Sequence, residues 1–343
     1  MEFNDIMSSL KKKEYKPVYF LMGEEPYFID RISNYIEQNI LDEAEKEFNQ
    51  IVLYGQDVDV LSVISEAKRF PMMGERTVVI IKEAQNIKNL TKDDSDLGKA
   101  KPPLIGYLEN PTPSTILVFC YKYKNLDKRT ALAKSFIKHA VLFESKKIYD
   151  NKIPDWIGVY LKSKKYSIEP KAAIMLTEFL GNDLGRISSE LEKLMINLPV
   201  GSEIRSDDIQ KYIGISKDFN VFELQNALGR KDVLKANRIA AYFGANKKDN
   251  PLVMTVPALY SYFNKLLAVH FVKDKTKEGV AKELKVHPFF VTDYLGAAKN
   301  YSAGKLVSVI SDLRETDLKS KGVGDASTED GELLKELIYK ILH

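Results

Sequence analysis

The first part of the chain alternates short, continuously apolar runs with segments of helical periodicity. Five runs rich in β-branched and aromatic residues predict strands, at residues 18–22, 50–53, 77–81, 115–120 and 141–143. In the third run every side chain from Val78 to Ile81 is apolar, so both faces of that strand are expected to be buried. Apolar positions recur at helical spacing between the first two runs. The pattern therefore predicts a doubly wound parallel sheet with helices on both faces.

Beyond residue 148, helical periodicity replaces the strand pattern. Apolar stripes at helical spacing are stopped by Gly181, Pro199 and Gly214, which is typical of a small helical bundle. Six or seven further helical segments follow, so the fold class is α/β and then all-α. Because 343 residues exceed the usual size of about 150 residues for one domain, we expect three. They are an α/β domain over 1–149, a small helical domain over 150–214 and a helical domain over 215–343.

The composition mainly excludes classes of partner and of binding site. The chain has 51 Lys and Arg against 48 Asp and Glu, a net charge of +3, which is too small to indicate a nucleic-acid or membrane partner from bulk charge. The single cysteine, Cys120, cannot form an internal disulfide or a structural zinc site, and a reducing, cytosolic setting fits best. The apolar run at residues 116–121 is far shorter than the roughly 20 residues that cross a bilayer. We expect a cytoplasmic protein with no membrane contact.

The turn after the first predicted strand is the place where an α/β protein would bind nucleotide phosphates. A P-loop reads G-x-x-x-x-G-K-[ST], because its amides, lysine and hydroxyl contact phosphate and magnesium. Here the turn consists of Gly23, Glu24, Glu25 and Pro26; the carboxylates repel phosphate, and the proline lacks an N–H donor. Lys82 stands at the end of the third strand, where an active ATPase carries a carboxylate for its metal. The sequence predicts a degenerate loop that binds no nucleotide, and no cofactor.

Other catalytic patterns are missing from the sequence. The four histidines, His139, His270, His287 and His343, have no metal-ligand spacing, and there is no G-x-S-x-G nucleophile motif. We therefore expect neither catalytic residues nor a metal site.

The segment before the third predicted strand carries an apolar tip. Pro71 and Gly74 predict a bend, and Phe70, Met72 and Met73 lie on it. Turns usually lie at the surface, and flexible methionines suit a groove on a partner, so the tip predicts a binding site. The alternative is that these side chains fold back onto the edge of the sheet.

Short landmarks occur in order along nearly the whole chain, at residues 17–26, 74–76, 126–129, 181–184, 190–194, 219–224, 286–289 and 317–319. Each is short, but their order and spacing together are specific. On these landmarks the chain resembles the delta subunits of bacterial DNA polymerase III, a family that forms part of the sliding-clamp loader.

The resemblance implies an AAA+-like fold in which the first two domains, including a helical lid, have lost ATPase function. The last domain would be a collar for oligomerisation in a five-membered ring with delta-prime and the loader ATPase subunits, gamma or tau. The chain would have no catalysis of its own, although it would be a subunit of a DNA-directed DNA polymerase (nucleotidyltransferase) holoenzyme. Its location would be the bacterial cytoplasm, at the nucleoid when it is part of the replisome.

In this family the bend before the third strand is a wedge that enters a hydrophobic pocket on the ring-shaped beta clamp. Carried over by position, its apolar members are Phe70, Pro71, Met72 and Met73; relatives often have Leu-Phe in place of the two methionines. The implied function is to bind the clamp and help to open it for loading onto primed DNA during replication.

The resemblance also places primer–template DNA near the collar, where His287 and Phe289 would face it. The alternative is that Pro288 starts a helix and Phe289 packs in the bundle. Three other functions stay open: an active AAA+ ATPase with a degenerate loop, a delta-prime-like loader subunit, and a collar-type scaffold without clamp contact. A single cysteine excludes the cysteine-rich zinc module that delta-prime-type subunits commonly carry.

Overall fold

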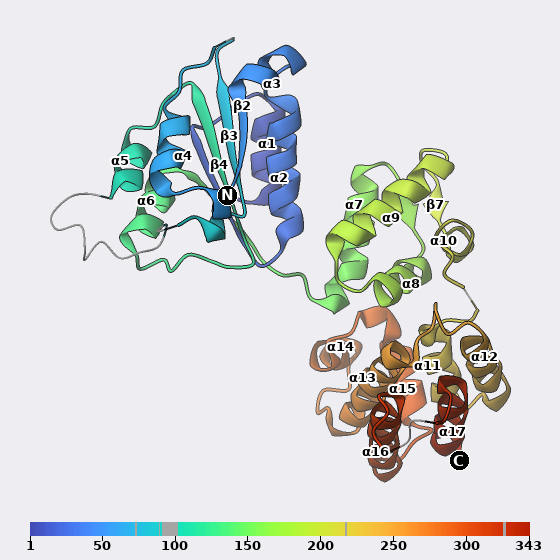
Figure 1. Cartoon of the computed structure of the whole chain (residues 1–343). Helices are drawn as coiled ribbons and strands as arrows, with labels where there is room; N and C mark the ends of the chain where they lie inside the picture. Colours follow the sequence, from blue (N-terminus) through green and yellow to red (C-terminus); the bar gives the residue numbers. More distant parts are fainter. Residues whose placement is uncertain (73, 89, 91–101, 217, 325–326) are drawn as a thin grey trace. The chain divides into compact units, whose positions relative to one another are not determined.

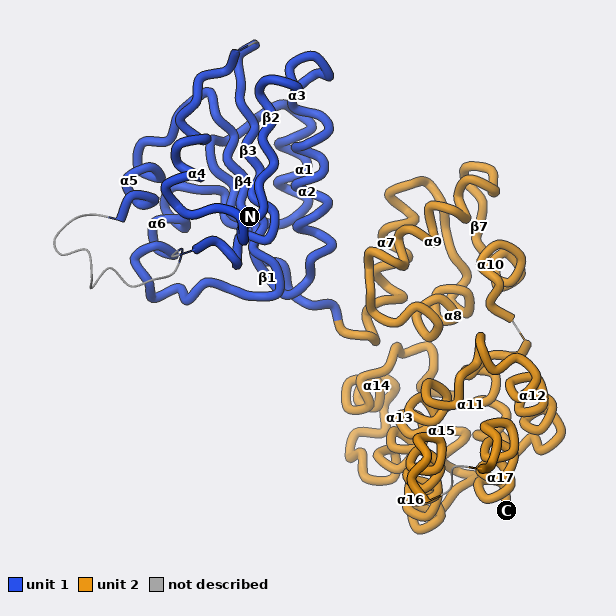
Figure 2. The backbone as a smooth tube through the Cα atoms, viewed as in Figure 1, with its two compact units in different colours: residues 1–148 blue, residues 149–343 orange. Residues whose placement is uncertain are grey.

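The computed structural model describes residues 1–72, 74–88, 90, 102–216, 218–324 and 327–343. These residues form two compact units, Met1–Ile148 and Tyr149–His343 (Figure 2). Met73, one of the four residues predicted to form the wedge, lies outside the described residues.

Unit 1 contains a five-stranded sheet in the order β2-β3-β4-β1-β5, with every neighbouring pair parallel. The strands are β1 (Val18–Gly23), β2 (Gln50–Tyr54), β3 (Thr77–Lys82), β4 (Thr115–Lys122) and β5 (Val141–Ser145). The helices are α1 (Phe3–Lys11), α2 (Pro26–Asn39), α3 (Glu43–Asn49), α4 (Val60–Ala67), α5 (Pro103–Glu109) and α6 (Ala131–His139), with short 3-10 turns η1 (Gly55–Asp57) and η2 (Ala84–Asn86). All five predicted strands are confirmed, each a residue or two longer than predicted.

Alternate side chains of the strands enter two separate cores. Tyr19 and Leu21 of β1 pack with α1 and α2, whereas Phe20 and Met22 pack with α4, α5 and α6. Figure 1 shows these two groups of helices on opposite faces of the sheet. Since successive residues of a strand point to opposite faces, a run that is apolar at every position is buried on both sides. The predicted doubly wound sheet is confirmed.

A parallel sheet has two different edges, one at the carboxyl ends of its strands and one at their amino ends. The turn from β1 to α2 lies at the carboxyl edge, with the end of β5 beside it. The connection from α4 to β3 lies at the amino edge, where α3 also runs into β2. Figure 1 shows the chain between α4 and β3 projecting beyond the sheet, next to α3.

The described part of unit 2 is almost entirely helical. Its first portion contains a 3-10 turn η4 (Asp150–Lys152), α7 (Ile153–Ser163), α8 (Pro170–Leu180), α9 (Leu184–Asn197) and α10 (Ser206–Ile213), with two short parallel strands, β6 (Ser167–Ile168) and β7 (Glu203–Ile204). The remainder contains α11 (Val221–Gly229), α12 (Val233–Ala245), α13 (Leu252–Phe271), α14 (Lys277–Leu284), a 3-10 turn η5 (Pro288–Phe290), α15 (Val291–Ala298), α16 (Ala303–Ser320) and α17 (Asp330–Leu342). The all-α pattern is confirmed apart from the β6–β7 pair; the division at residue 214 stays a prediction.

Helix α13 is long and apolar enough to cross a membrane by length and composition alone. Its residues Val256, Leu259, Phe263 and Leu266 are at most 2% exposed within the helical core of unit 2. A core helix of a folded bundle passes the same composition test, and this packing explains why α13 is apolar.

Candidate functional site

The turn after β1 is held tightly against the end of β5. Gly23 has a φ of +136°, and a Cβ built there would lie 2.0 Å from the Ser145 carbonyl oxygen. The Gly23 N–H donates to the Lys124 carbonyl (3.2 Å), and the Glu24 N–H donates to the Ser145 carbonyl (3.0 Å). The close approach requires glycine at position 23. Two amides of the turn are thereby used within the chain.

Glu25 occupies the amino end of α2. Its side chain is 8% exposed, and its Oε1 accepts the Tyr27 N–H at 3.2 Å. The buried Ser145 Oγ donates to the Glu25 carbonyl at 2.7 Å. Pro26 is the first helical residue, where a missing N–H costs nothing. An amide that would face a phosphate in a nucleotide site therefore faces the protein's own carboxylate.

Two lysines at the carboxyl ends of β3 and β4 are paired with acidic residues of α2. Lys82 lies 3.1 Å from Glu37, and Lys122 lies 2.6 Å from Asp30. Lys82 is the residue that the sequence predicts to replace the metal-binding carboxylate of an active ATPase. Its ion pair with Glu37 joins the end of β3 to α2.

The opposite, amino edge carries exposed apolar side chains. Phe70 is 82% exposed and Met72 is 70% exposed, while Pro71 between them is half-buried. We call the described residues Phe70, Pro71 and Met72 the wedge. The alternative expected from the sequence, that these side chains fold back onto the sheet, is not what the structure has for Phe70 and Met72. Two large apolar side chains exposed within three residues make a small contiguous apolar patch, the kind of surface that a partner can cover.

The backbone of the wedge is nevertheless fixed by α3. The Met72 N–H donates to Asn49 Oδ1 at 2.8 Å, and Asn49 is 1% exposed. Gly74 has a φ of +68°, and a Cβ there would lie 1.7 Å from Glu45 Oε1. Sequence reasoning identified the bend but missed Asn49 and Glu45. Asn49 and Met72 are 23 residues apart, and no local sequence pattern marks the contacts that the two α3 residues make.

Cationic groups flank the wedge on both sides. Before it, Arg69 pairs with Glu66 at 2.8 Å. After it, the Arg76 guanidinium lies over the Tyr15 ring, 5.1 Å from the centroid. Tyr15, Arg76 and Gly74 also line a surface hollow of about 360 Å³. The wedge thus projects from a rim of polar and charged groups, the usual anatomy of a protein–protein contact.

His287 and Phe289 lie in unit 2 around η5. His287 Nδ1 accepts the Phe289 N–H at 3.3 Å, so the proton of the neutral ring is on Nε2, which lies 3.1 Å from Asp155 Oδ1. Phe289 is 52% exposed and meets Phe290 edge-on, with ring centroids 5.2 Å apart. Pro288 does start a short helix, as the alternative held, but Phe289 is half-open to solvent. His287 and Phe289 belong to unit 2, whereas the wedge belongs to unit 1.

A cavity beside Phe289 contains a buried carboxylate. The cavity measures about 440 Å³, and in it Glu223 is 6% exposed. Glu223 accepts from Lys235 and, at 2.8 Å, from Lys171. Burial alone would raise the pKa of Glu223, but the hydrogen bonds from the two lysines outweigh it and lower the pKa. The carboxylate is therefore a structural ion-pair centre that stays charged.

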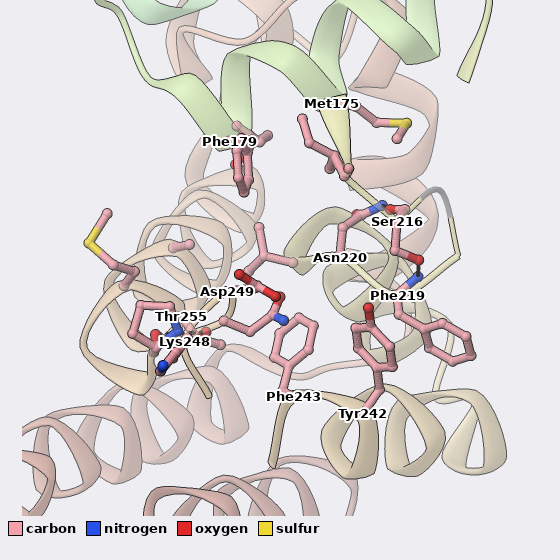
Figure 3. Close-up of a pocket in the computed structure, with 18 of the residues that line it drawn as sticks. Met175, Phe179, Ser216, Phe219, Asn220, Tyr242, Phe243, Lys248, Asp249 and Thr255 are labelled. Atoms are coloured by element: carbon pink, nitrogen blue, oxygen red, sulfur yellow. Dashed lines mark hydrogen bonds between the residues drawn. The ribbon is translucent and has the colours of Figure 1, made fainter. Parts of the chain in front are cut away.

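A second cavity in unit 2, of about 310 Å³, lies among α8, α11, α12 and α13. In Figure 3, Met175 and Phe179 enter it from one side and Tyr242 and Phe243 from the other. Tyr242 stacks on Phe219, with ring centroids 4.8 Å apart. Side chains of both charges complete the lining, namely Arg186, Lys248, Glu178 and Asp249. This mixture selects no ligand by charge.

No group of three or more His, Cys, Asp or Glu side chains suited to a metal ion occurs among the residues that the structure describes. Cys120 is buried, and burial raises its pKa to about 12. A thiol with so high a pKa is a poor nucleophile. Within the same residues, the feature that the sequence singled out and the structure leaves exposed is the pair Phe70 and Met72 at the amino edge of the sheet.

Comparisons with known proteins identify relatives along most of the chain. Residues 19–146 match the family described as DNA polymerase III, delta subunit, and residues 218–338 match the C-terminal domain of the same subunit. The DNA polymerase III subunit delta of Bacillus subtilis (strain 168) is 28% identical over 335 residues, which cover 97% of this chain and 94% of the relative. The solved structure of the Bacillus subtilis DNA clamp loader delta protein has a TM-score of 0.60 at 26% identity, with 99% of each chain covered.

Proposed function

The chain belongs to the delta-subunit family of DNA polymerase III and is a clamp-loader subunit, and we propose that its wedge, Phe70, Pro71 and Met72, binds the sliding clamp. The observation that carries this proposal is the exposure of Phe70 and Met72 on a backbone that is itself fixed. Met73 continues the wedge in sequence and is included in the proposal by its position alone.

The energetics of the wedge favour a partner with an apolar pocket. Burying a Phe or Met side chain contributes about 1.5–3 kcal/mol. Two such side chains together supply roughly 3–6 kcal/mol, a factor of a hundred or more in affinity. Since Phe70 and Met72 are mostly solvent-exposed in the chain alone, nearly all of this area is available to the clamp.

Clamp opening follows from a difference in affinity. A closed ring and an open ring are two states, and a binder shifts their balance only by the extra affinity it has for one of them. Delta would bind a clamp protomer more tightly when its ring interface is sprung, and so stabilise the open ring while DNA enters. ATP binding and hydrolysis would take place in the gamma or tau subunits and control access to the wedge.

The turn from Gly23 to Pro26 is, in this proposal, a degenerate nucleotide loop in an AAA+-like domain. Its amides donate to the chain's own carbonyls and to Glu25, which leaves no cradle for phosphate. The subunit would therefore contribute binding and not catalysis to the polymerase holoenzyme. Unit 2 would comprise the helical lid and the collar, and the collar would join delta-prime and the loader ATPases in a ring in the bacterial cytoplasm.

The collar would also face primer–template DNA in the assembled loader. The half-exposed ring of Phe289 is suited to stacking on an unpaired base. The neighbouring His287 is already engaged with Asp155 at 3.1 Å, so its part would be to hold the start of η5 in place.

The test is clamp binding measured by calorimetry with the sliding clamp of the same organism. Phe70→Ala combined with Met72→Ala should weaken binding at least about a hundredfold, without lowering the melting temperature. Ile137→Ala is the matched control, because Ile137 is an apolar residue of α6 that is 51% exposed and belongs to neither edge of the sheet. Unchanged binding by the double variant would leave only the scaffold function.

The rival ATPase function has its own test. Titration of the isolated chain with ATP should give no saturable binding in the micromolar range, with the loader ATPase as the positive control. Micromolar affinity for ATP that Gly23 or Glu25 variants abolish would contradict the proposal of a degenerate loop.

A further inference from the structure

Helix α3 touches the wedge at two points with one face. Glu45 and Asn49 are four residues apart, so they lie one above the other on the helix surface. Asn49 receives the Met72 N–H, and Glu45 lies against Gly74. The two contacts fall two residues apart in the segment between α4 and β3. This segment is therefore clasped by α3 at its tip and just beyond it.

The two α3 side chains that contact this segment, Glu45 and Asn49, are themselves held in place. At the start of α3 the Glu45 N–H donates to Asp42 Oδ1 at 2.9 Å, and the Asp42 N–H donates to Glu45 Oε2 at 3.2 Å. This reciprocal capping holds the Glu45 carboxylate in place. Asn49 is 1% exposed at the other end of the helix, and its Oδ1 reaches the exposed wedge from a buried position. A polar side chain buried this deeply is normally hydrogen-bonded, and the Met72 N–H is one partner of Asn49.

We propose that Asn49 is a positioning residue for clamp binding: by accepting the Met72 N–H it sets the wedge backbone in its binding geometry before the clamp arrives. This inference rests on the proposed function of the wedge. Ordering a flexible segment at the moment of binding costs affinity, because only the fraction of molecules in the competent geometry can bind. Asn49 keeps that fraction high, although it contributes no surface of its own to the clamp.

The first measurement is the affinity of Asn49→Leu for the sliding clamp. Leucine has the same branching and number of heavy atoms as asparagine but no acceptor, and loss of one hydrogen bond predicts binding that is about five- to tenfold weaker. Asn49→Asp keeps an oxygen at the same place and should restore most of the affinity. Ser33→Ala is the control: Ser33 is 1% exposed and donates to the Asp30 carbonyl at 3.2 Å, in a helix that does not touch the wedge. It should bind the clamp as the wild type does.

The second measurement separates positioning from a general loss of stability. Hydrogen–deuterium exchange at the Met72 amide should be slow in the free wild-type chain and fast in Asn49→Leu, while amides of β1 exchange equally slowly in both. In a double-mutant cycle, Asn49→Leu should lose most of its effect on clamp affinity when Phe70→Ala and Met72→Ala are both already present, because few apolar side chains are then left for the wedge backbone to position. Additive effects in the cycle, or fast exchange at Met72 in the wild type, would overturn the proposal. Asn49→Ser, whose hydroxyl is too short to reach Met72, replaces Asn49→Leu if that variant does not fold.

The outcomes also distinguish the positioning role of Asn49 from the proposed clamp binding by the wedge, on which it rests. If Phe70→Ala combined with Met72→Ala leaves clamp binding unchanged, the proposed function of the wedge is wrong. If that double variant weakens binding and Asn49→Leu does not, the wedge binds the clamp and only the positioning by Asn49 is refuted.

Discussion

The two edges of the sheet in unit 1 differ in which of their groups have partners within the chain. At the carboxyl edge, the turn from Gly23 to Pro26 has its amides and the Glu25 carboxylate engaged within the chain. At the amino edge, the chain holds only the backbone of the wedge and leaves Phe70 and Met72 in solvent. Ligands of open α/β sheets usually bind at the carboxyl edge. In this chain the turn at that edge is paired with the chain's own groups, and the surface proposed to bind the clamp is at the other edge.

The two edges differ in whether their groups already have partners within the chain. A polar group that already has a partner gains little from a ligand, because one hydrogen bond is only exchanged for another. An apolar side chain in water gains its full transfer free energy when a partner covers it. The paired polar groups of the carboxyl edge therefore contribute to folding stability. The exposed apolar side chains of the amino edge would gain their transfer free energy only when a partner buries them.

The largest effect should come from Gly23→Ala. A Cβ at this position would lie 2.0 Å from a backbone oxygen of β5, and backbone in a sheet cannot move aside cheaply, so we expect more than about 3 kcal/mol of destabilisation. Alkylation of Cys120, which is buried with its pKa raised to about 12, reports the opening of unit 1. If Cys120 is alkylated as slowly in the variant as in the wild type, the close approach of Gly23 to β5 is not a rigid constraint on unit 1.

Gly74→Ala should give a smaller effect that is divided between stability and binding. The left-handed φ of +68° costs about 1–2 kcal/mol for alanine, and Glu45 must leave its capping position to admit the methyl group. Gly214→Ala is the matched control, because Gly214 has a φ of +85° in the left-handed region and nothing lies within 4 Å of the added Cβ. Both variants should lower the melting temperature, but only Gly74→Ala should weaken clamp binding, by roughly tenfold. Equal clamp affinities of the two variants would mean that the clasp by α3 does not shape the wedge.

The sequence was a good guide wherever short-range rules decide the structure. The strands could be predicted because burial on both faces leaves a continuous apolar run such as Val78 to Ile81. The bend of the wedge could be predicted because Pro71 fixes its own φ and Gly74 accepts the positive φ of +68° that the bend requires. The same reasoning could have recognised Glu25 as the cap of α2, since it directly precedes a proline at the first helical position.

Long-range pairings were beyond such rules. Asn49 meets Met72 across 23 residues, and His287 meets Asp155 across 132; in each case tertiary packing selects one polar side chain among many. The strands β6 and β7, two residues each, are too short to leave a periodic signal. For the candidate site, the sequence located the exposed apolar residues but not the helix that holds them.

The smallest effect concerns Asp59, which caps α4, the helix that runs from the carboxyl edge to the wedge. Asp59 Oδ1 accepts the Ser62 N–H at 2.8 Å, and hydrogen bonds from Ser62 lower the pKa of Asp59 below its ordinary value of 3.8. A carboxyl group with a lowered pKa in the folded state contributes stability above its unfolded pKa and loses it as the pH falls through the folded pKa. Asparagine caps helices about as well but does not titrate. Asp59→Asn should therefore melt slightly earlier than the wild type near neutral pH, and the two should converge well below pH 3.8. A difference in melting temperature that stays constant across this range, measured by circular dichroism, would show that the charge of Asp59 does not stabilise α4.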